Sequence, residues 1–382
     1  MRKEYLLSPG PTPIPPDVAA AATIPIIHHR TPRFEGWMKE VSAGLQYLFC
    51  TKNDVITLSA TGTGAMEAAV ANLLSPGDTV ICAIGGKFGD RWVELCRAYQ
   101  AEPVIIQAPY GTAPKPEAVR EALRNHPNAK AVFTQLCETS TGCRYDVKAI
   151  GEIVAETPAV FVVDGISGLL AEKCATDAWM VDVLVSGSQK GFMLPPGLAF
   201  ISMSTKAWAA AETAKSPRYY FDLRAYKKGL ATGAHPYTPA VGLITQLQVA
   251  IQQLRTITIE GLWARHAWLG NACRAGVKAL NLEFFAETPA NVLTAVKAPA
   301  GIPGEKIVGM LRDRFGVTIA GAQGAEMKGK IFRIAHLGYM DRFDMVVAMS
   351  ALELTLQQLG YPVTLGTGVA ATEALLVEEA KV

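Results

Sequence analysis

The sequence predicts an α/β fold built on a doubly wound, mostly parallel sheet. Two observations support this. Short apolar runs rich in β-branched residues alternate with stretches of helical length along residues 55–202. Several of these runs also end in glycine or small polar residues, which is typical of strands that end at a ligand-binding edge. About seven strands are expected, at residues 55–59, 79–84, 104–106, 131–134, 159–163, 181–185 and 198–202.

Amphipathic segments lie between or before these strands. Residues 32–49, 116–123 and 146–155 place apolar side chains at helical spacing, and further helices are expected after the glycine-rich turns at 60–64 and 85–89. Because the helices must cover the apolar faces of the strands, we expect them on both sides of the sheet.

The two ends of the chain depart from this alternation. Segment 7–16 is rich in proline, which lacks an N–H and fixes φ, so an extended arm is expected there. A long helix from about 240 to 261 is expected to lead into the last third. Strands 292–296 and 331–335 alternate with helices there, and the tail 367–382 is a charged helix or a frayed end. The expected organisation is an N-terminal arm at 1–20, a large domain at 21–260 and a smaller α+β domain at 261–382.

Composition restricts the function. The chain has 382 residues, 50% of them hydrophobic, and its 36 basic and 34 acidic side chains give a net charge of +2, which does not suggest nucleic acid or a membrane as partner. The charged start Arg2-Lys3-Glu4 followed by prolines is unlike a signal peptide, and no run approaches the roughly 18 apolar residues of a membrane helix. Seven cysteines without a Cys-x-x-Cys pair favour reduced thiols and a cytoplasmic location. Six histidines without ligand spacing make a metal site unexpected.

The most informative stretch is the strand 181–185 and the small polar residues that follow it up to Lys190. A lysine just beyond a buried strand lies at the carboxyl edge of the sheet, where partial burial lowers its pKa and makes the amine nucleophilic. Alternatively, Lys190 simply ends the strand at the surface. Asp164 ends the preceding buried strand. This pair suits a pyridine ring, with the carboxylate on its nitrogen and the amine on its aldehyde carbon.

A glycine-rich turn, Ala60-Thr61-Gly62-Thr63-Gly64, joins the first strand of the predicted sheet to a helix. Free N–H groups, two hydroxyls and the helix dipole favour a phosphate there. The turn is neither a P-loop nor a dinucleotide fingerprint, and it could also be only a tight connection.

Three further side chains could belong to the same site. Phe88 lies between glycines and could cover a flat ring or only fix its loop. The hydroxyl of Thr139 follows the strand 131–134 and could reach the phenolic oxygen of the ring. Arg333 interrupts an apolar strand and needs an anion, either a buried carboxylate of the protein or the carboxylate of a substrate.

With Ser186-Gly187-Ser188-Gln189-Lys190, Asp164, Thr61-Gly62-Thr63 and Arg333 together, the chain resembles the class V aminotransferases, which are fold-type-I pyridoxal-phosphate enzymes. The resemblance runs from Ser8-Pro9-Gly10-Pro11 to about Gly338. It is closest to the alanine–glyoxylate/serine–pyruvate group and the related soluble hydrogenase small subunit proteins. It implies a large domain with a seven-stranded, mostly parallel sheet and a small α+β C-terminal domain.

The resemblance also implies roles for individual residues. With pyridoxal 5′-phosphate as cofactor, Lys190 would form the internal aldimine and Asp164 would hold the pyridinium nitrogen. Phe88 would stack on the ring, more weakly than the tryptophan that is common in the family. Arg333 would bind the substrate α-carboxylate beside the backbone of Gly10. The other cofactor-binding residues would be Thr61, Gly62, Thr63, Thr139, Ile166 and Gln189, with Thr238 reaching in from a second subunit and His235 or Tyr237 at the position of a phosphate-binding tyrosine.

The implied reaction is a ping-pong transamination in which Lys190 moves the substrate α-proton. Serine or alanine is the expected donor, with glyoxylate or pyruvate as acceptor. Aspartate with 2-oxoglutarate is the close alternative and needs a second cation, for which Arg30 and Lys87 are candidates. Because the family completes its site across a twofold axis, a homodimer is implied.

Two other classes share this fold. A cysteine desulfurase or β-lyase typically has histidine immediately before the lysine, where Gln189 stands here. A non-catalytic partner subunit has no need of the intact set Lys190, Asp164 and Arg333.

Overall fold

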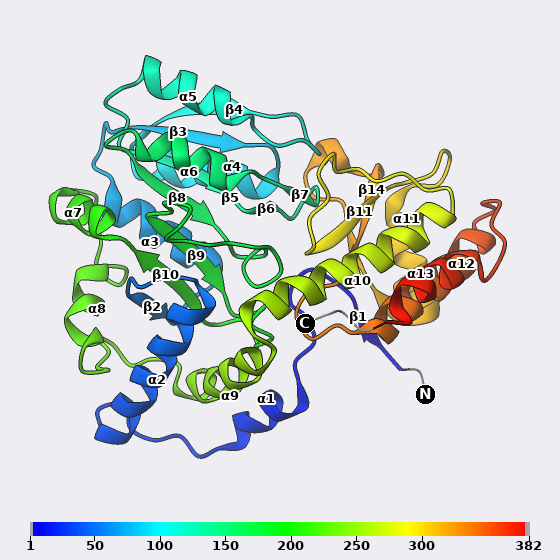
Figure 1. Cartoon of the computed structure of the whole chain (residues 1–382), viewed down its shortest axis with the longest axis horizontal. Helices are drawn as coiled ribbons and strands as arrows, with labels where there is room; N and C mark the ends of the chain where they lie inside the picture. The colour runs from blue at the N-terminus through cyan, green and yellow to red at the C-terminus, as the bar shows by residue number, and fades with distance from the viewer. Residues whose placement is uncertain (1–2, 379–382) are drawn as a thin grey trace.

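The computed structural model describes residues 3–378 and contains a seven-stranded sheet in the order β2-β10-β9-β8-β5-β3-β4 (Figure 1). Only β10 is antiparallel to its neighbours, so the prediction of a mostly parallel sheet is confirmed. The strands, in sheet order, are β2 (Val55–Leu58), β10 (Ala199–Met203), β9 (Val183–Gly187), β8 (Val160–Asp164), β5 (Ala131–Gln135), β3 (Thr79–Ile84) and β4 (Glu102–Gln107).

Helices cover both faces of this sheet, because the strands carry apolar side chains on both sides. One face packs against α2 (Pro32–Leu48), α5 (Pro116–Asn125), α6 (Val147–Ala155) and α9 (Val241–Ile257). The other face packs against α3 (Gly62–Leu73), α4 (Lys87–Ala98), α7 (Thr205–Thr213) and α8 (Leu223–Leu230).

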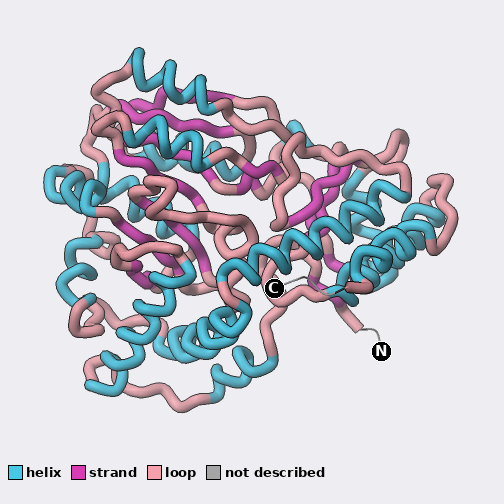
Figure 2. Tube along the Cα trace, in the orientation of Figure 1, coloured by secondary structure: helices cyan, strands magenta, loops and turns pink. Residues whose placement is uncertain are grey.

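A separate core forms around a three-stranded antiparallel sheet in the last third of the chain (Figure 2). Its strands are β11 (Leu293–Lys297), β14 (Ile331–Ala335) and β13 (Ala320–Gly321), and its helices are α10 (Ile259–Ala279), α11 (Gly304–Met310), α12 (Arg342–Gln358) and α13 (Thr367–Leu376). The remaining short elements are α1 (Pro16–Ala20), β6 (Cys137–Glu138), β7 (Cys143–Arg144), and turns of 3₁₀- or π-helix at Ala21–Thr23, Leu311–Phe315 and Ala325–Met327. Within residues 3–378, no helix combines the length and apolar character needed to cross a bilayer.

The N-terminal arm joins the two cores. Its first segment, β1 (Tyr5–Leu6), pairs in parallel with β12 (Val317–Thr318). The arm then reaches the end of the large sheet, where the Thr12 hydroxyl donates to the carbonyl of Lys190 at 3.1 Å. Residues 7–15 form neither helix nor strand, as expected, but the segment bends at residues 8–11 and is not extended throughout. It reaches Lys190, the residue predicted to carry the chemistry.

The predicted long helix from 240 to 261 is wrong, since two helices meet at Thr258. This residue adopts φ of +66°, which ends α9, and its side chain accepts from the N–H of Gly261 to cap α10. Figure 1 shows α10 running from the large sheet toward the small one. Helices α7 and α8, in the polar and aromatic segment before Tyr237, were not predicted from the sequence. The predicted helix in the tail is present as α13, whereas residues 379–382 lie outside the described part of the chain.

Candidate active site

A cavity of about 460 Å³ opens at the carboxyl ends of the parallel strands, the edge where open α/β sheets bind ligands. Asp164 is the last residue of β8, and Lys190 follows β9 by three residues. The N-terminus of α3 completes the wall. The lining residues are Thr61, Gly62, Thr63, Phe88, Arg91, Thr139, Asp164, Ile166, Ser167, Gln189 and Lys190.

Lys190 lies inside this cavity and not on the outer surface. Its Nζ donates to the main-chain carbonyl of Pro9 at 2.7 Å. Burial and then the positive charge of Arg333 lower the pKa of the amine to about 8. Gly10 lies against the amine so closely that a Cβ built at this position would be 2.2 Å from Nζ. At pH 7 about a tenth of the amine is thus neutral and nucleophilic, far more than for a lysine with the ordinary pKa.

Asp164 is buried at the edge of the sheet. The N–H of Ile166 donates to its Oδ1 at 2.7 Å. Burial raises the pKa of the carboxyl to about 7, and the negative charge of Glu138 acts in the same direction. A cationic partner would favour the ionised form, so the position suits a protonated ring nitrogen.

The start of α3 offers unshared polar groups. No side chain of the described residues caps this helix, although Thr61 is its N-cap. The side-chain oxygen of Gln189 is buried and has no hydrogen-bond partner among the described residues. Arg91 donates to the Thr63 hydroxyl at 2.9 Å, which adds a cation to the helix dipole. This end of the cavity therefore suits a phosphate.

Two residues that line the cavity, Arg91 and Ser167, were not predicted from the sequence. Arg91 lies three residues after Phe88 on α4, with its guanidinium carbon 5.3 Å from the centre of that ring, so helical spacing was the available signal. Ser167 shares a 2.6 Å hydrogen bond with Thr139. Nothing in the sequence indicated that Ser167 belongs to the site, because its contact with Thr139 joins turns that follow different strands.

Arg333 is buried in β14, with 2% of its surface exposed. Its three hydrogen bonds to described residues go to main-chain carbonyls, two to Gly321 and one to Thr139. None of these bonds involves a protein carboxylate, so the alternative of a buried ion pair finds no support in direct contacts. Burial lowers the pKa of the guanidinium to about 10, which leaves it charged and in need of an anion.

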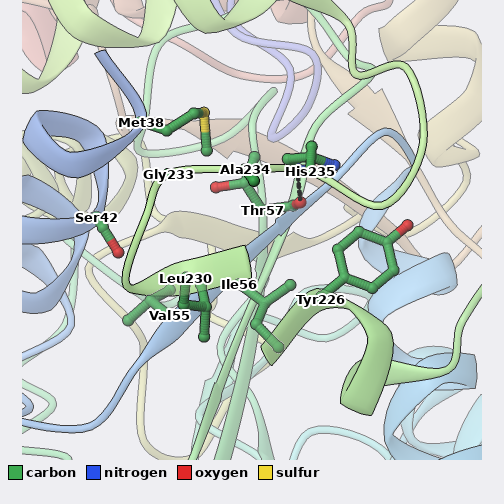
Figure 3. Close-up of a pocket in the computed structure, with 10 residues that line it drawn as sticks. All are labelled: Met38, Ser42, Val55, Ile56, Thr57, Tyr226, Leu230, Gly233, Ala234 and His235. Atoms are coloured by element: carbon green, nitrogen blue, oxygen red, sulfur yellow. Dashed lines mark hydrogen bonds between the residues drawn. The ribbon is translucent and has the colours of Figure 1, made fainter. Parts of the chain in front are cut away.

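Several predicted residues lie outside the cavity of this chain. Figure 3 shows His235 in a separate pocket beside Thr57. Its Nε2 donates to the main-chain carbonyl of Thr57 at 3.1 Å. Burial lowers the pKa of His235 to about 4, which keeps the ring neutral. The Tyr237 hydroxyl donates to the carbonyl of Tyr219 at 3.0 Å, and Thr238 is exposed.

The two proposed suppliers of a second cation are also elsewhere. Lys87 pairs with Glu94 at 3.2 Å, and the guanidinium of Arg30 donates to the ring of His29. Neither side chain lines the cavity that contains Lys190.

Comparison with known proteins assigns the family. Residues 4–355 match the model of "Aminotransferase class-V". The chain belongs to the class V aminotransferase family. It is therefore a pyridoxal 5′-phosphate-dependent enzyme, and the fold-type-I architecture expected from the sequence is confirmed.

This aminotransferase is similar to proteins with several names. It is 43% identical to the soluble hydrogenase small subunit of Synechococcus sp. (strain PCC 6716), with 98% of each chain covered. It is 35% identical to the L-aspartate–glyoxylate aminotransferase of Paracoccus denitrificans, with coverage of 96% of this chain and 94% of that one. It is also 35% identical to the serine–glyoxylate aminotransferase of Methylorubrum extorquens, with coverage of 98% and 96%.

The solved structures agree. The ureidoglycine–glyoxylate aminotransferase of Bacillus subtilis superposes with a TM-score of 0.94 at 27% identity, with 99% of each chain covered.

The cavity fits the cofactor of the family. An unpartnered Gln189 oxygen and the uncapped start of α3 lie at one end of the cavity, and Asp164 and Lys190 line it as well. Gly62 makes room beside them, since a Cβ at this position would be 2.6 Å from Ile166. These groups match the phosphate, ring nitrogen and aldehyde of pyridoxal phosphate in chemical type.

Proposed function

We propose that this aminotransferase transfers the amino group of a small amino acid, serine or alanine, to glyoxylate or pyruvate. The observation that carries the proposal is the guanidinium of Arg333, the one fully buried arginine among residues 3–378. It is close enough to Lys190 to lower the pKa of the amine, and it binds only main-chain carbonyls. One such cation suits one α-carboxylate. The other proposed cations, Lys87 and Arg30, lie outside the cavity. Arg91 lines it but binds Thr63 at the end proposed for the phosphate, so a second carboxylate has no evident partner among residues 3–378.

The named relatives support glyoxylate as an acceptor. Three of the similar proteins described above carry glyoxylate in their names, with aspartate, serine or ureidoglycine as the other substrate. A site that holds an amino acid only by its α-carboxylate would accept glyoxylate as the smallest keto acid of the same type.

Lys190 is the proposed acid–base residue. When bound, pyridoxal phosphate supplies an aldehyde that takes up the amino group and a protonated ring that accepts electron density from the substrate α-carbon. Lys190 would remove the α-proton as its neutral amine and return it at C4′ of the cofactor. Arg333 would hold the substrate carboxylate, and Gly10 would leave space beside the amine.

The remaining residues are proposed to hold the cofactor. Asp164 would keep the ring nitrogen protonated, with Phe88 and Ile166 at the ring faces. Thr139 would donate to the phenolic oxygen. The phosphate would be held by Thr61, Gly62, Thr63, Gln189 and the newly found Arg91.

We further propose that the protein is a homodimer and is located in the cytoplasm. We also propose that the chain divides into an arm at 1–20, a large domain at 21–260 and a small domain at 261–382. Tyr237 and Thr238 lie outside the cavity of their own chain and are partly or fully exposed, so a second subunit could receive them. The seven cysteines are all free, which agrees with a reducing compartment.

Aspartate with 2-oxoglutarate is the second candidate for the substrate pair. The name of the Paracoccus relative favours its donor, aspartate, but gives glyoxylate as the other substrate. A lyase or cysteine desulfurase is less well supported, because Gln189 stands where those enzymes have histidine, and its buried oxygen faces the cavity.

The test is a half-reaction screen on the purified, cofactor-loaded protein. Each amino acid is added alone, and the visible absorbance of the bound cofactor is followed as it is converted to the amine form. Conversion by serine and alanine but not aspartate supports the proposal. Fast conversion by aspartate would replace it with the dicarboxylate candidate, and no conversion by any amino acid would reject transamination.

A further inference from the structure

The buried carboxylate of Glu138 has no part in the mechanism described above, yet it collects five hydrogen bonds. Glu138 is fully buried in the short hairpin that follows β5. Its Oε1 accepts from the Ser140 hydroxyl at 2.5 Å, the Ser140 N–H at 3.0 Å and the Phe88 N–H at 3.3 Å. Its Oε2 accepts from the Gly89 N–H and the Gln135 amide, both at 2.9 Å.

Four of the five donors come from two segments beside the cofactor cavity, the start of α4 and the turn after β6, whereas Gln135 is the last residue of β5. Phe88 and Gly89 form the first turn of α4, where Phe88 lines the cavity. Ser140 lies in the turn after β6, directly after Thr139, which also lines the cavity. Because a carboxylate that is bound on both oxygens cannot rotate without losing donors, it holds the two segments at one fixed separation.

The carboxylate also explains the second glycine of the pair Gly85-Gly86. A Cβ at Gly86 would lie 2.5 Å from both Cγ and Cδ of Glu138, and 2.7 Å from the Ser140 hydroxyl. Gly86 has φ of 173°, an extended conformation that any residue adopts, so the requirement at this position is for space alone. The turn therefore carries glycine because the carboxylate packs directly against its backbone.

The charge of Glu138 also reaches the substrate side. Among the neighbouring groups whose negative charge raises the pKa of Arg333, Glu138 has the largest effect, although burial lowers that pKa overall. The same hairpin supplies the Thr139 carbonyl to which Arg333 donates at 2.6 Å. Glu138 does not line the cavity itself. It is bonded to the N–H of Phe88, on the cofactor side, and it precedes Thr139, whose carbonyl accepts from Arg333 on the substrate side.

We propose that Glu138 is a positioning residue, whose carboxylate sets the placement of Phe88 and Thr139 against the cofactor ring. The inference goes beyond the proposed substrates, since it concerns cofactor binding in the absence of any amino acid.

The test compares Glu138→Gln with a matched variant, Glu353→Gln. A glutamine amide would turn an NH₂ toward at least two of the N–H or O–H donors around Glu138, so we expect the dissociation constant of pyridoxal phosphate to rise about tenfold or more. The circular dichroism of the bound cofactor should also fall. Glu353 is a buried carboxylate in α12 that accepts from the N–H groups of Gly366, Gly368 and Val369, remote from the cavity. Its variant should lower the melting temperature but keep cofactor affinity within about twofold.

A second variant tests the proposal even if Glu138→Gln does not fold. Gly86→Ala keeps the carboxylate but displaces it, and we expect it to weaken cofactor binding in the same direction. Unchanged affinity and dichroism in the Gly86→Ala variant, or in Glu138→Gln where it folds, would overturn the proposal. An equal loss of affinity in Glu353→Gln would overturn it too, because the effect would then be one of general stability.

Discussion

The side-chain amine of Lys190 donates a 2.7 Å hydrogen bond to the main-chain carbonyl of Pro9, 181 residues away in the sequence. The bond shows that the N-terminal arm is part of the site. It places a neutral acceptor, and not a carboxylate, on the amine. The lowered pKa of Lys190 is consistent with this, because a carbonyl gives the ammonium form less support than an anion would.

We expect Lys190→Ala to lower turnover by at least about 1,000-fold, because it removes both the group that captures the cofactor aldehyde and the proposed base. The visible absorbance of the bound cofactor should disappear while the far-ultraviolet circular dichroism stays unchanged. Lys206→Ala, on the outer helix α7, serves as the control and should retain activity. Turnover that survives in the Lys190 variant would reject the assignment.

Arg333→Ala should raise the KM for every amino acid about 10- to 100-fold, the range expected when a charge-assisted hydrogen bond to a carboxylate is lost. Cofactor affinity should change far less. The matched control is Arg265→Ala, since Arg265 also donates to main-chain carbonyls, those of Gly338 and Met340, but does not line the Lys190 cavity. Equal losses of substrate and cofactor affinity in the Arg333 variant would mean that this arginine is structural.

The capture of pyridoxal phosphate by the apoprotein should depend on pH through Lys190. The pKa of the amine is lowered from 10.5 to about 8, so the reactive neutral form dominates above that pH and falls about tenfold for each unit below it. Stopped-flow absorbance should therefore show a rate that rises with pH and levels off above about 8. A rate that continues to rise toward pH 10 would contradict the burial of the amine.

Gly10→Ala should slow cofactor capture and lower turnover, because its Cβ would lie 2.2 Å from the Lys190 amine. The residue also has φ of +151°, which side chains rarely adopt. Gly36→Ala is the matched control, since a Cβ there meets nothing within 4 Å and the position lies within α2. We expect that variant to be active and slightly more stable, by about 0.5–1 kcal/mol in the free energy of unfolding. Normal kinetics in Gly10→Ala would show that the arm moves away from the amine.

The sequence predicted much of the large sheet, because strand ends and turns are local signals. Asp164 and Lys190 were found from the runs that precede them, and the structure places both in one cavity. The pairing of β1 with β12 was not predictable, since it joins residues about 310 positions apart. The bend at Thr258 was hidden because a β-branched residue at positive φ opposes local preference and is sustained by the surrounding packing.

The site was harder to complete than the fold. Arg91 carried a usable signal in its helical spacing from Phe88, whereas Ser167 and Glu138 act through contacts between segments that follow different strands. Arg333 was found as an anomaly in an apolar strand. Only the structure showed that its direct partners are carbonyls, so that an anion is missing from its immediate surroundings.

The path of the arm has a mechanical consequence. Residues 7–12 of the arm are hydrogen-bonded to both sheets. The carbonyl of Leu7 accepts from the N–H of Ala335 in the small sheet, and Pro9 and Thr12 are bonded to Lys190 at the end of the large sheet. A rigid-body shift of one sheet relative to the other must therefore pull on the Pro9 carbonyl. The hydrogen bond from Lys190 therefore makes the position of the reactive amine depend on how the two sheets are placed relative to each other.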